Sequence, residues 1–514
     1  MSRARNVNFK RPPHRPAGMA ISWPTPDQAL AALVPLALLL VAWRLFFTPS
    51  ISSSPETPPS SSPYSDSTSA FSTTLGSPNA SASSLPLLPP IAASHPLSLA
   101  TALNGYSSYG RIATAELARM RATLAALPRT SRRLALGAGY GKRLDALADA
   151  TVVNEKVVFK IVRLARDVMR EDAKRRERGG GLEEGGGWES LVMALKGNVA
   201  MGGEAGPGSI ERVREALKHL VRDWSTEGAS ERETFHTPIM EALQLLFPQS
   251  KPCSSSSDSD SSSDSTTTDS DSETERPIIL IPGAALSRLA HTLSRSPYNM
   301  RTHACELSYY PILALQMLLD PNLTPKEEYH ELRPWAHWFS HQRGEDFSLD
   351  GQLLAGRGAL RSVRVPDVVP RLTPRFQILS GDFLHVPVPG TGYDALASLF
   401  FIDTSIDVTR TIAHIFTLLK PGGWWVNCGP LLWTGGGLAV ELSLAEVLSV
   451  VRAVGFEIWG EGNSSDRKND EEERRKVLGR RVIRGEYTAD RQAMMSWVYE
   501  AEFWVARKPV SASA

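Results

Sequence analysis

The amino-acid sequence predicts an α/β fold, in which a doubly wound, mostly parallel sheet follows an N-terminal helical segment. Short apolar runs alternate with helical patterns from residue 277 to residue 508, and this alternation is typical of βαβ units in a parallel sheet. The run Tyr393–Asp403 is almost continuously apolar, as expected of a strand that is buried on both faces. Between residues 98 and 248 the apolar spacing is helical.

The composition excludes several classes of protein. The 514 residues carry 56 basic and 55 acidic side chains, a net charge of +1, so no overall field favours nucleic acid as a partner. A hydrophobic content of 42% supports a sizeable core, and the length predicts roughly two to four domains. The cysteines, Cys253, Cys305 and Cys428, lack the spacing of a zinc site or a disulfide framework. We therefore predict no metal site.

The first 97 residues are predicted to lie outside the folded domain. A basic tail, 1–28, precedes an apolar run at 29–47, which is long enough for a membrane anchor if its arginine snorkels to the interface. The charge bias would leave the N-terminus in the cytosol. An interfacial anchor or a mis-joined gene start would explain the same run. The Ser/Pro-rich stretch 48–97 has few large apolar side chains, so we interpret it as a disordered linker.

A helical subdomain is predicted for residues 98–248. Helices are expected where apolar residues recur at i, i+3, i+4 and i+7, at 111–127, 144–175, 210–224 and 237–247. The stretch 249–276 follows and consists largely of Ser, Thr, Asp and Glu. This composition predicts a disordered acidic insertion that loops out of the fold.

The main domain is predicted for residues 277–508. It opens with a buried strand at Ile278–Ile281, a tight turn at Gly283, and a helix whose N-terminal N–H groups can face a ligand. The remaining strands are expected at 301–306, 376–379, 393–403, 424–428, 456–459 and 499–506, the helices at 309–319, 408–419 and 442–454, and a charged, exposed insertion at 464–481.

Polar residues follow successive strands at the edge where parallel sheets place their ligands. Glu306 comes about twenty residues after Gly283, where a carboxylate accepts hydrogen bonds from ribose hydroxyls. Asp382 and Phe383 follow the next strand and can bracket an adenine. Each acid has a simpler interpretation, Glu306 as a helix N-cap and Asp382 as a turn residue. A dinucleotide is disfavoured because the turn lacks the further glycines of a pyrophosphate cradle.

A more specific resemblance is carried by Val221–Gly228, Ile281–Ala290, Phe400–Thr404 and Lys420–Leu432, together with Arg333–Ser340 and the pair Met494-Met495. In these motifs the chain resembles the carnosine N-methyltransferase family, a branch of the class I methyltransferases, over roughly residues 100–508. The resemblance implies a seven-stranded, Rossmann-like methyltransferase sheet, S-adenosylmethionine as cofactor, and methylation of an imidazole nitrogen of carnosine or a related histidine-containing dipeptide or peptide. It also implies a cytosolic or nuclear protein, whereas an anchor at 29–47 would make it membrane-associated.

The resemblance implies roles for individual residues, with the helical region before the sheet closing over the cofactor. Asp403 is the implied catalytic residue, because a carboxylate that accepts one imidazole N–H fixes the tautomer of the attacking ring. The alternative role of Asp403 is an N-cap for the helix after Thr404. Cofactor contacts are implied for His219, Arg222, Gly283, Ala285, Glu306, Asp382, Phe383 and Leu399, and substrate contacts for Asp403, Thr434, Tyr487 and Tyr499.

The chain departs from the family's pattern at His219, where the family has glutamine, and in two motifs. Ala285 and Ser287 replace glycines of the family's turn, and their side chains cost most if φ is positive there. Thr434 stands where the family has a histidine that contacts substrate. Two alternatives therefore stay open: a methyltransferase of the same fold with another small-molecule or protein substrate, and a non-catalytic, membrane-tethered protein that has kept the fold. The sequence sets no oligomeric state.

Overall fold

The computed structural model describes residues 88–89, 91–92, 94–177, 208–248, 276–337, 340–343, 358–433, 440–461 and 470–510. Within these ranges, no helix combines the length and the apolar character needed to cross a membrane. The predicted tail and anchor, at 1–28 and 29–47, lie outside the described residues, as do most of the linker and of the acidic insertion.

The N-terminal part of the described chain is helical, as predicted, but two helices begin earlier than expected. The first starts at Leu99, because the Ser98 hydroxyl accepts a hydrogen bond from the Thr101 N–H (3.2 Å) and caps it. The last starts at Ala229, so that Pro238 lies inside the helix. The elements are α2 (Leu99–Ala126), α3 (Arg129–Gly137), α4 (Tyr140–Glu177), α6 (Ser209–Trp224) and α7 (Ala229–Leu246).

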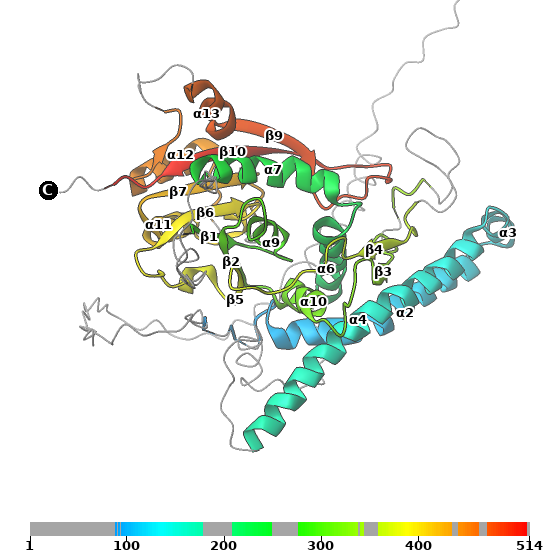
Figure 1. Cartoon of the computed structure of the whole chain (residues 1–514). Coiled ribbons are helices and arrows are strands. Elements are labelled where there is room, and N and C mark those ends of the chain that lie inside the picture. Colours follow the sequence, from blue (N-terminus) through cyan, green and yellow to red (C-terminus); the bar gives the residue numbers. More distant parts are fainter. Residues whose placement is uncertain are drawn as a thin grey trace, which may run out of the picture. The chain divides into compact units, whose positions relative to one another are not determined.

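The helices of this segment share a core with the sheet domain. Figure 1 shows α2 and α4 side by side, joined at one end by α3. Tyr106 of α2 is fully buried and donates a hydrogen bond of 2.7 Å to the carbonyl of Tyr310, in α10 (Tyr309–Leu319). Trp224 and Phe235 belong to the same hydrophobic cluster as Phe376 of the sheet. The sheet and the helices before it therefore pack as neighbours in one core.

The central sheet has the strand order β5-β2-β1-β6-β7-β10-β8, and β9 also pairs with β10. The first five strands in this order run parallel to one another, and β10 is antiparallel to β7, β8 and β9. The predicted seven-stranded, mostly parallel sheet is confirmed, and β9 is an addition to it. The strands are β1 (Ile278–Pro282), β2 (Arg301–Glu306), β5 (Phe376–Ser380), β6 (Tyr393–Leu399), β7 (Leu419–Gly429), β8 (Glu457–Ile458), β9 (Arg481–Glu486) and β10 (Val498–Arg507).

Helices cover both faces of the sheet, as a doubly wound fold requires (Figure 1). On one face, α9 (Arg288–Leu293) and α10 share a cluster with α6 and α7. On the other face, α11 (Val408–Leu418) and α12 (Leu444–Val454) pack on Trp425 and Trp504. Four further elements were not predicted: the helix α3, the short antiparallel pair β3 (His330–Leu332) and β4 (Val363–Val365), and α13 (Asp470–Leu478) within the charged stretch.

A buried polar group joins β6 to β7 and generates a prediction about stability. The Ser398 hydroxyl donates to Asn427 Oδ1 (2.8 Å) and accepts from Trp425 Nε1 (2.8 Å). Ser398→Ala leaves both partners unpaired, so we expect the free energy of unfolding in urea to fall by about 1–3 kcal/mol. Ser107→Ala, on the exposed face of α2, is the control and should change little. Equal stability of the two variants would contradict the prediction.

Candidate functional site

A pocket opens where the carboxyl ends of β1 and β6 meet the C-terminal end of α6. This is the edge at which open α/β sheets place their ligands. Five of the predicted site residues line it, namely Arg222, Gly283, Ala285, Leu399 and Tyr487. The other lining residues are Asp223, His236, Ile281, Pro282, Ala284, Arg288 and Leu289.

The turn after β1 has a left-handed backbone at three positions. The φ angle is +61° at Gly283, +47° at Ala285 and +58° at Ser287. A Cβ atom on Gly283 would lie 2.8 Å from Cδ2 of Phe401, so this position requires glycine. Ala285 and Ser287 carry side chains in the same region of φ, which costs about 1–2 kcal/mol per residue. The cost foreseen for these two positions is therefore present in the fold.

Glu306 closes the turn from the end of β2. Its Oε2 accepts a hydrogen bond from the Ala285 N–H (2.7 Å), and its Oε1 accepts one from the Ser308 N–H (2.8 Å). The N-cap position of α10 belongs to Ser308, not to Glu306. Burial raises the pKa of Glu306, and the N–H donors of Ser308 and Ala285 act against that rise. The carboxyl group is thus a half-buried acceptor beside the turn.

Asp382 and Phe383 lie after β5 and do not line the pocket. Asp382 caps the 3₁₀ turn Phe383–His385, because its carboxylate accepts the Leu384 N–H (3.0 Å). Asp382 is therefore a turn residue, which is the simpler of its two predicted roles. The Phe383 ring is buried, with its centroid 5.2 Å from that of Phe401. Since Phe401 also faces Gly283, Phe383 reaches the β1 turn through one intervening ring.

Five charged side chains gather at the end of α6. Arg222 binds both carboxylate oxygens of Asp223, at 2.6 and 3.0 Å. Burial alone would lower the pKa of Arg222, but Asp223 outweighs burial and raises it. Burial would raise the pKa of Asp223, and Arg222 lowers it. Arg232 and Arg288 both pair with Asp367. The cluster thus holds three guanidinium groups and two carboxylates, and the carboxyl group of Glu231 lies near enough to raise the pKa of Arg222.

Two histidines accompany the charged cluster, of which His236 is buried and His219 half-buried. His219 lies one helical turn before Arg222 in α6, and His236 lines the pocket from α7. Burial lowers the pKa of each to about 3, with Arg222 acting in the same direction. Both are therefore neutral at physiological pH. The structure places His219 near Arg222 but not among the lining residues.

Aromatic side chains connect the pocket to the end of β6. The Tyr487 ring stacks on Phe400, with centroids 3.7 Å apart and planes 2° apart. The Tyr487 hydroxyl accepts a hydrogen bond from Arg222 Nη1 (2.7 Å). Tyr499 meets the edge of Phe400 at 5.4 Å. The two predicted substrate-side tyrosines thus contact one phenylalanine, Phe400, which is the first residue of the motif Phe400–Thr404.

Asp403 lies in the 3₁₀ turn Ile402–Thr404, directly after β6, and is 5% exposed. Its Oδ2 accepts the Leu432 N–H (3.0 Å) from the loop after β7. Burial raises its pKa to about 6, and the Leu432 donor opposes that rise. The alternative role as an N-cap is wrong, because α11 begins later and is capped by Asp407.

Some predicted residues fall outside the pocket, and some of its residues were missed. Thr434 lies outside the described residues. Among the described residues, no cluster of His, Cys, Asp and Glu could hold a metal ion. Among the polar lining residues, Asp223, His236 and Arg288 were missed. Only Arg288 had a local signal, because it directly follows the small-residue turn.

The comparisons with known proteins agree with the motifs. Residues 203–258 and 261–510 match a family model described as Carnosine N-methyltransferase. Carnosine N-methyltransferase unmet of Drosophila melanogaster is 32% identical over 311 residues, which are 59% of this chain and 56% of that protein. Carnosine N-methyltransferase of Rattus norvegicus is 29% identical over 307 residues, 58% of this chain and 64% of that protein. The chain thus spans 56% and 64% of the length of these two relatives.

A comparison with solved structures also finds methyltransferases. A phosphoethanolamine N-methyltransferase 2 of Haemonchus contortus with S-adenosyl-L-methionine is 12% identical, with a TM-score of 0.30. The match covers 59% of this chain and 58% of that one.

The strained turn generates a prediction about stability. Ser287 has a positive φ, and its buried hydroxyl has no hydrogen-bond partner in the described part of the chain. Ser287→Gly relieves both costs, so we expect the free energy of unfolding to rise by about 1–3 kcal/mol in urea denaturation. Ser294→Gly is the matched control. Its φ is −74° and its hydroxyl bonds the His291 carbonyl (2.7 Å), so this variant should lose stability. A loss of stability in both variants would contradict the prediction that Ser287 is strained.

Proposed function

The chain belongs to the carnosine N-methyltransferase family, and we propose that it is an S-adenosylmethionine-dependent enzyme that methylates an imidazole nitrogen of carnosine, giving anserine, or of a related histidine-containing dipeptide or peptide. The position of Tyr487 carries this proposal. Its hydroxyl bonds Arg222 in the pocket, and its ring stacks on Phe400 beside Asp403. The proposed cofactor side and the proposed substrate side therefore meet at one side chain.

The chemistry of the pocket fits S-adenosylmethionine. The guanidinium groups of Arg222 and Arg288 line the pocket, and such groups suit the carboxylate of a methionyl group. Glu306 is a half-buried carboxyl group beside the turn, and each of its oxygens, which already accepts one backbone N–H, can accept a further hydrogen bond from a ribose hydroxyl. When bound, this cofactor supplies a methyl group on a positively charged sulfur. Arg222, Glu306 and the backbone of the β1 turn are the groups proposed to hold it.

Asp403 is proposed to hold the imidazole of the substrate. Its carboxylate would accept the N–H of one ring nitrogen, which fixes the tautomer and leaves the other nitrogen unprotonated for attack. With a pKa of about 6, Asp403 is ionised at neutral pH. Methylation gives the ring a positive charge. The proton on the other ring nitrogen, which is hydrogen-bonded to Asp403, can then pass to the carboxylate or to water. Burial raises the pKa of Tyr499 most, and the nearby carboxylate of Asp403 raises it further.

Two other functions remain as candidates. Thr434 replaces a substrate-contacting histidine of the family, and this departure favours the same reaction on a different small-molecule or protein substrate. The positive φ angles at Ala285 and Ser287 place side chains at the turn where a ligand would approach. They favour a chain that has kept the fold without catalysis. The two experiments below separate these candidates.

The first experiment measures cofactor binding. We expect the full-length chain to bind S-adenosylmethionine in a calorimetric titration. Glu306→Ala should weaken that binding by about 1–3 kcal/mol, because it removes an acceptor for the cofactor and a restraint on the turn. Glu461→Ala is the control, because Glu461 forms an ion pair with Arg452 at the partly exposed surface. The absence of binding heat from the wild type at millimolar cofactor would refute the enzyme and favour the non-catalytic candidate.

The second experiment tests Asp403 through the pH dependence of methyl transfer to carnosine, histidine and a histidine-containing peptide. Because the carboxylate must be ionised, kcat/KM should fall as the pH drops below about 6. Asp403→Asn should lower kcat by about a hundredfold or more and reduce the limiting acid slope of log kcat/KM by about one, because one titrating group is lost. Asp407→Asn, at the cap of α11, should keep the wild-type slope. Full activity of Asp403→Asn on every accepted substrate would remove Asp403 from the mechanism.

A further inference from the structure

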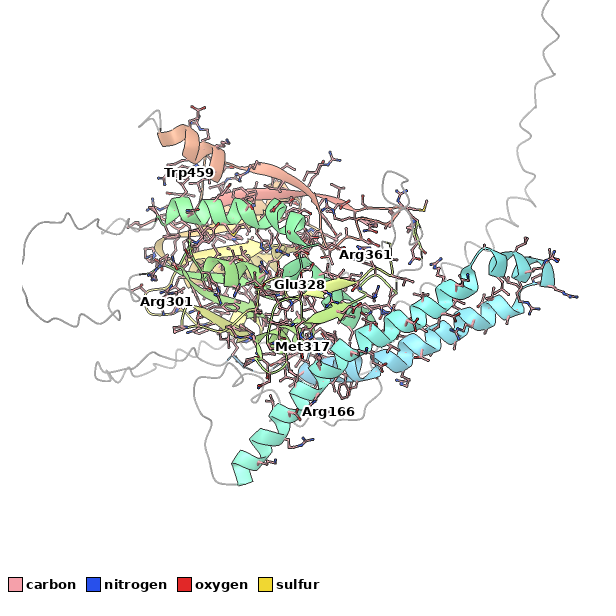
Figure 2. The ribbon with its side chains drawn as sticks, turned by 45° about the vertical axis from the view of Figure 1, so that its right-hand side comes forward. Arg166, Arg301, Met317, Glu328, Arg361 and Trp459 are labelled. Carbon is pink, nitrogen blue, oxygen red and sulfur yellow. The ribbon has the colours of Figure 1, made fainter. Side chains whose placement is uncertain are left out.

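The connection between β9 and β10, residues 487–497, lies against the first turn of α7, and we call it the strap. The Thr488 N–H donates to both carboxylate oxygens of Glu231, at 2.9 Å each. Farther along, Asp490 pairs with Arg361 (2.9 Å), which is labelled in Figure 2. The strap is thus held at more than one point. Glu231 holds the residue next to Tyr487.

Thr488 has a backbone conformation that needs outside support. Its φ angle is +53°, in the left-handed region that β-branched residues rarely adopt. Such conformations persist where the surrounding contacts enforce them. The Thr488 hydroxyl is buried and has no hydrogen-bond partner within the described ranges, so it gives no support. The two hydrogen bonds to Glu231 are the contacts that restrain this residue.

Tyr487, the residue before Thr488, contacts both the pocket and the end of β6. Tyr487 lines the pocket, stacks on Phe400 and accepts a hydrogen bond from Arg222. Glu231 does not line the pocket. Glu231 does raise the pKa of Arg222, which lines the pocket. An effect of Glu231 on ligand binding can therefore pass through this charge or through the strap, and hydrogen exchange in the strap separates the two routes.

We propose that Glu231 is a positioning residue: it holds Thr488 in the left-handed conformation and so keeps Tyr487 against Phe400 and Arg222. This deepens the proposed function, and it rests on that function for its effect on S-adenosylmethionine binding. The effect on the conformation of the strap does not depend on the cofactor.

The charge of Glu231 does not serve the stability of the fold. Burial raises its pKa to about 7, and Asp223 acts in the same direction, while Arg222, the Thr488 N–H and Arg232 oppose the rise. The folded-state pKa is thus above the ordinary value of 4.5, so ionised Glu231 opposes folding as the pH rises through this interval. A neutral residue at this position should leave stability at pH 8 unchanged or higher.

The test uses Glu231→Gln in the wild type and in a Thr488→Gly background, at pH 8. Hydrogen exchange at the Thr488 amide, or across residues 486–490 in the glycine background, reports the strap, calorimetry reports S-adenosylmethionine binding, and the melting temperature reports stability. Glu233→Gln is the matched control, because Glu233 is exposed and lies in the same part of α7.

We expect Glu231→Gln to accelerate exchange in the strap by about tenfold, the scale of a hydrogen bond to a charged group. Cofactor affinity should fall by a similar factor, and the melting temperature should not fall. In the glycine background both effects should shrink to about twofold, because glycine adopts this conformation without strain. The control should change none of these quantities.

Three results would overturn the proposal: exchange in the strap equal to that of the control, equal effects in both backgrounds, or a fall in melting temperature that accounts for the lost affinity. If the wild type binds no cofactor, the proposed function fails. The exchange data would still decide whether Glu231 positions the strap.

Discussion

The Ala285 N–H donates a hydrogen bond of 2.7 Å to Glu306, and the arrangement of the pocket follows from this contact. It ties the turn after β1 to the end of the neighbouring parallel strand β2. With the turn held, the Leu286 carbonyl accepts a hydrogen bond from Trp224 Nε1 (3.0 Å). Trp224 ends α6, two residues after Arg222. The sheet thereby sets where the helical segment presents its guanidinium group.

Left-handed backbone conformations surround the same pocket. Besides the turn residues, Phe400 has φ of +49° at the end of β6 and Thr488 has φ of +53° in the strap. Such residues cost of order 1–3 kcal/mol each and persist only where their surroundings determine them. At Phe400 the backbone N–H donates to the Cys428 carbonyl (2.9 Å), and Gly429 leaves room for this approach. The backbone of the pocket is therefore fixed by its neighbours and not by local preference.

The parts of the site that follow from local pattern were predictable, and those that follow from distant contacts were not. Glu306 and Asp382 end successive strands, so periodicity alone placed them at one edge of the sheet. Arg222 and Tyr487 were indicated only by the family resemblance. The roles of Glu231 and Phe400 were missed because they depend on a backbone angle and on partners far along the chain. Apolar runs located most strands, but β9 was missed because Arg481–Glu486 alternates apolar and charged residues beside a charged stretch.

Two carboxyl groups with raised pKa values act on Tyr487 from different sides. Burial brings the pKa of Asp403 to about 6 and that of Glu231 to about 7, and both carboxylates raise the pKa of Tyr487, which burial raises most. As the pH falls through this interval, both groups take up protons. Asp403 would then lose its charge as the proposed acceptor for an imidazole N–H, and Glu231 would become a weaker acceptor for the Thr488 N–H. Both changes occur as the pH falls below neutrality, where an imidazole substrate would itself take up a proton.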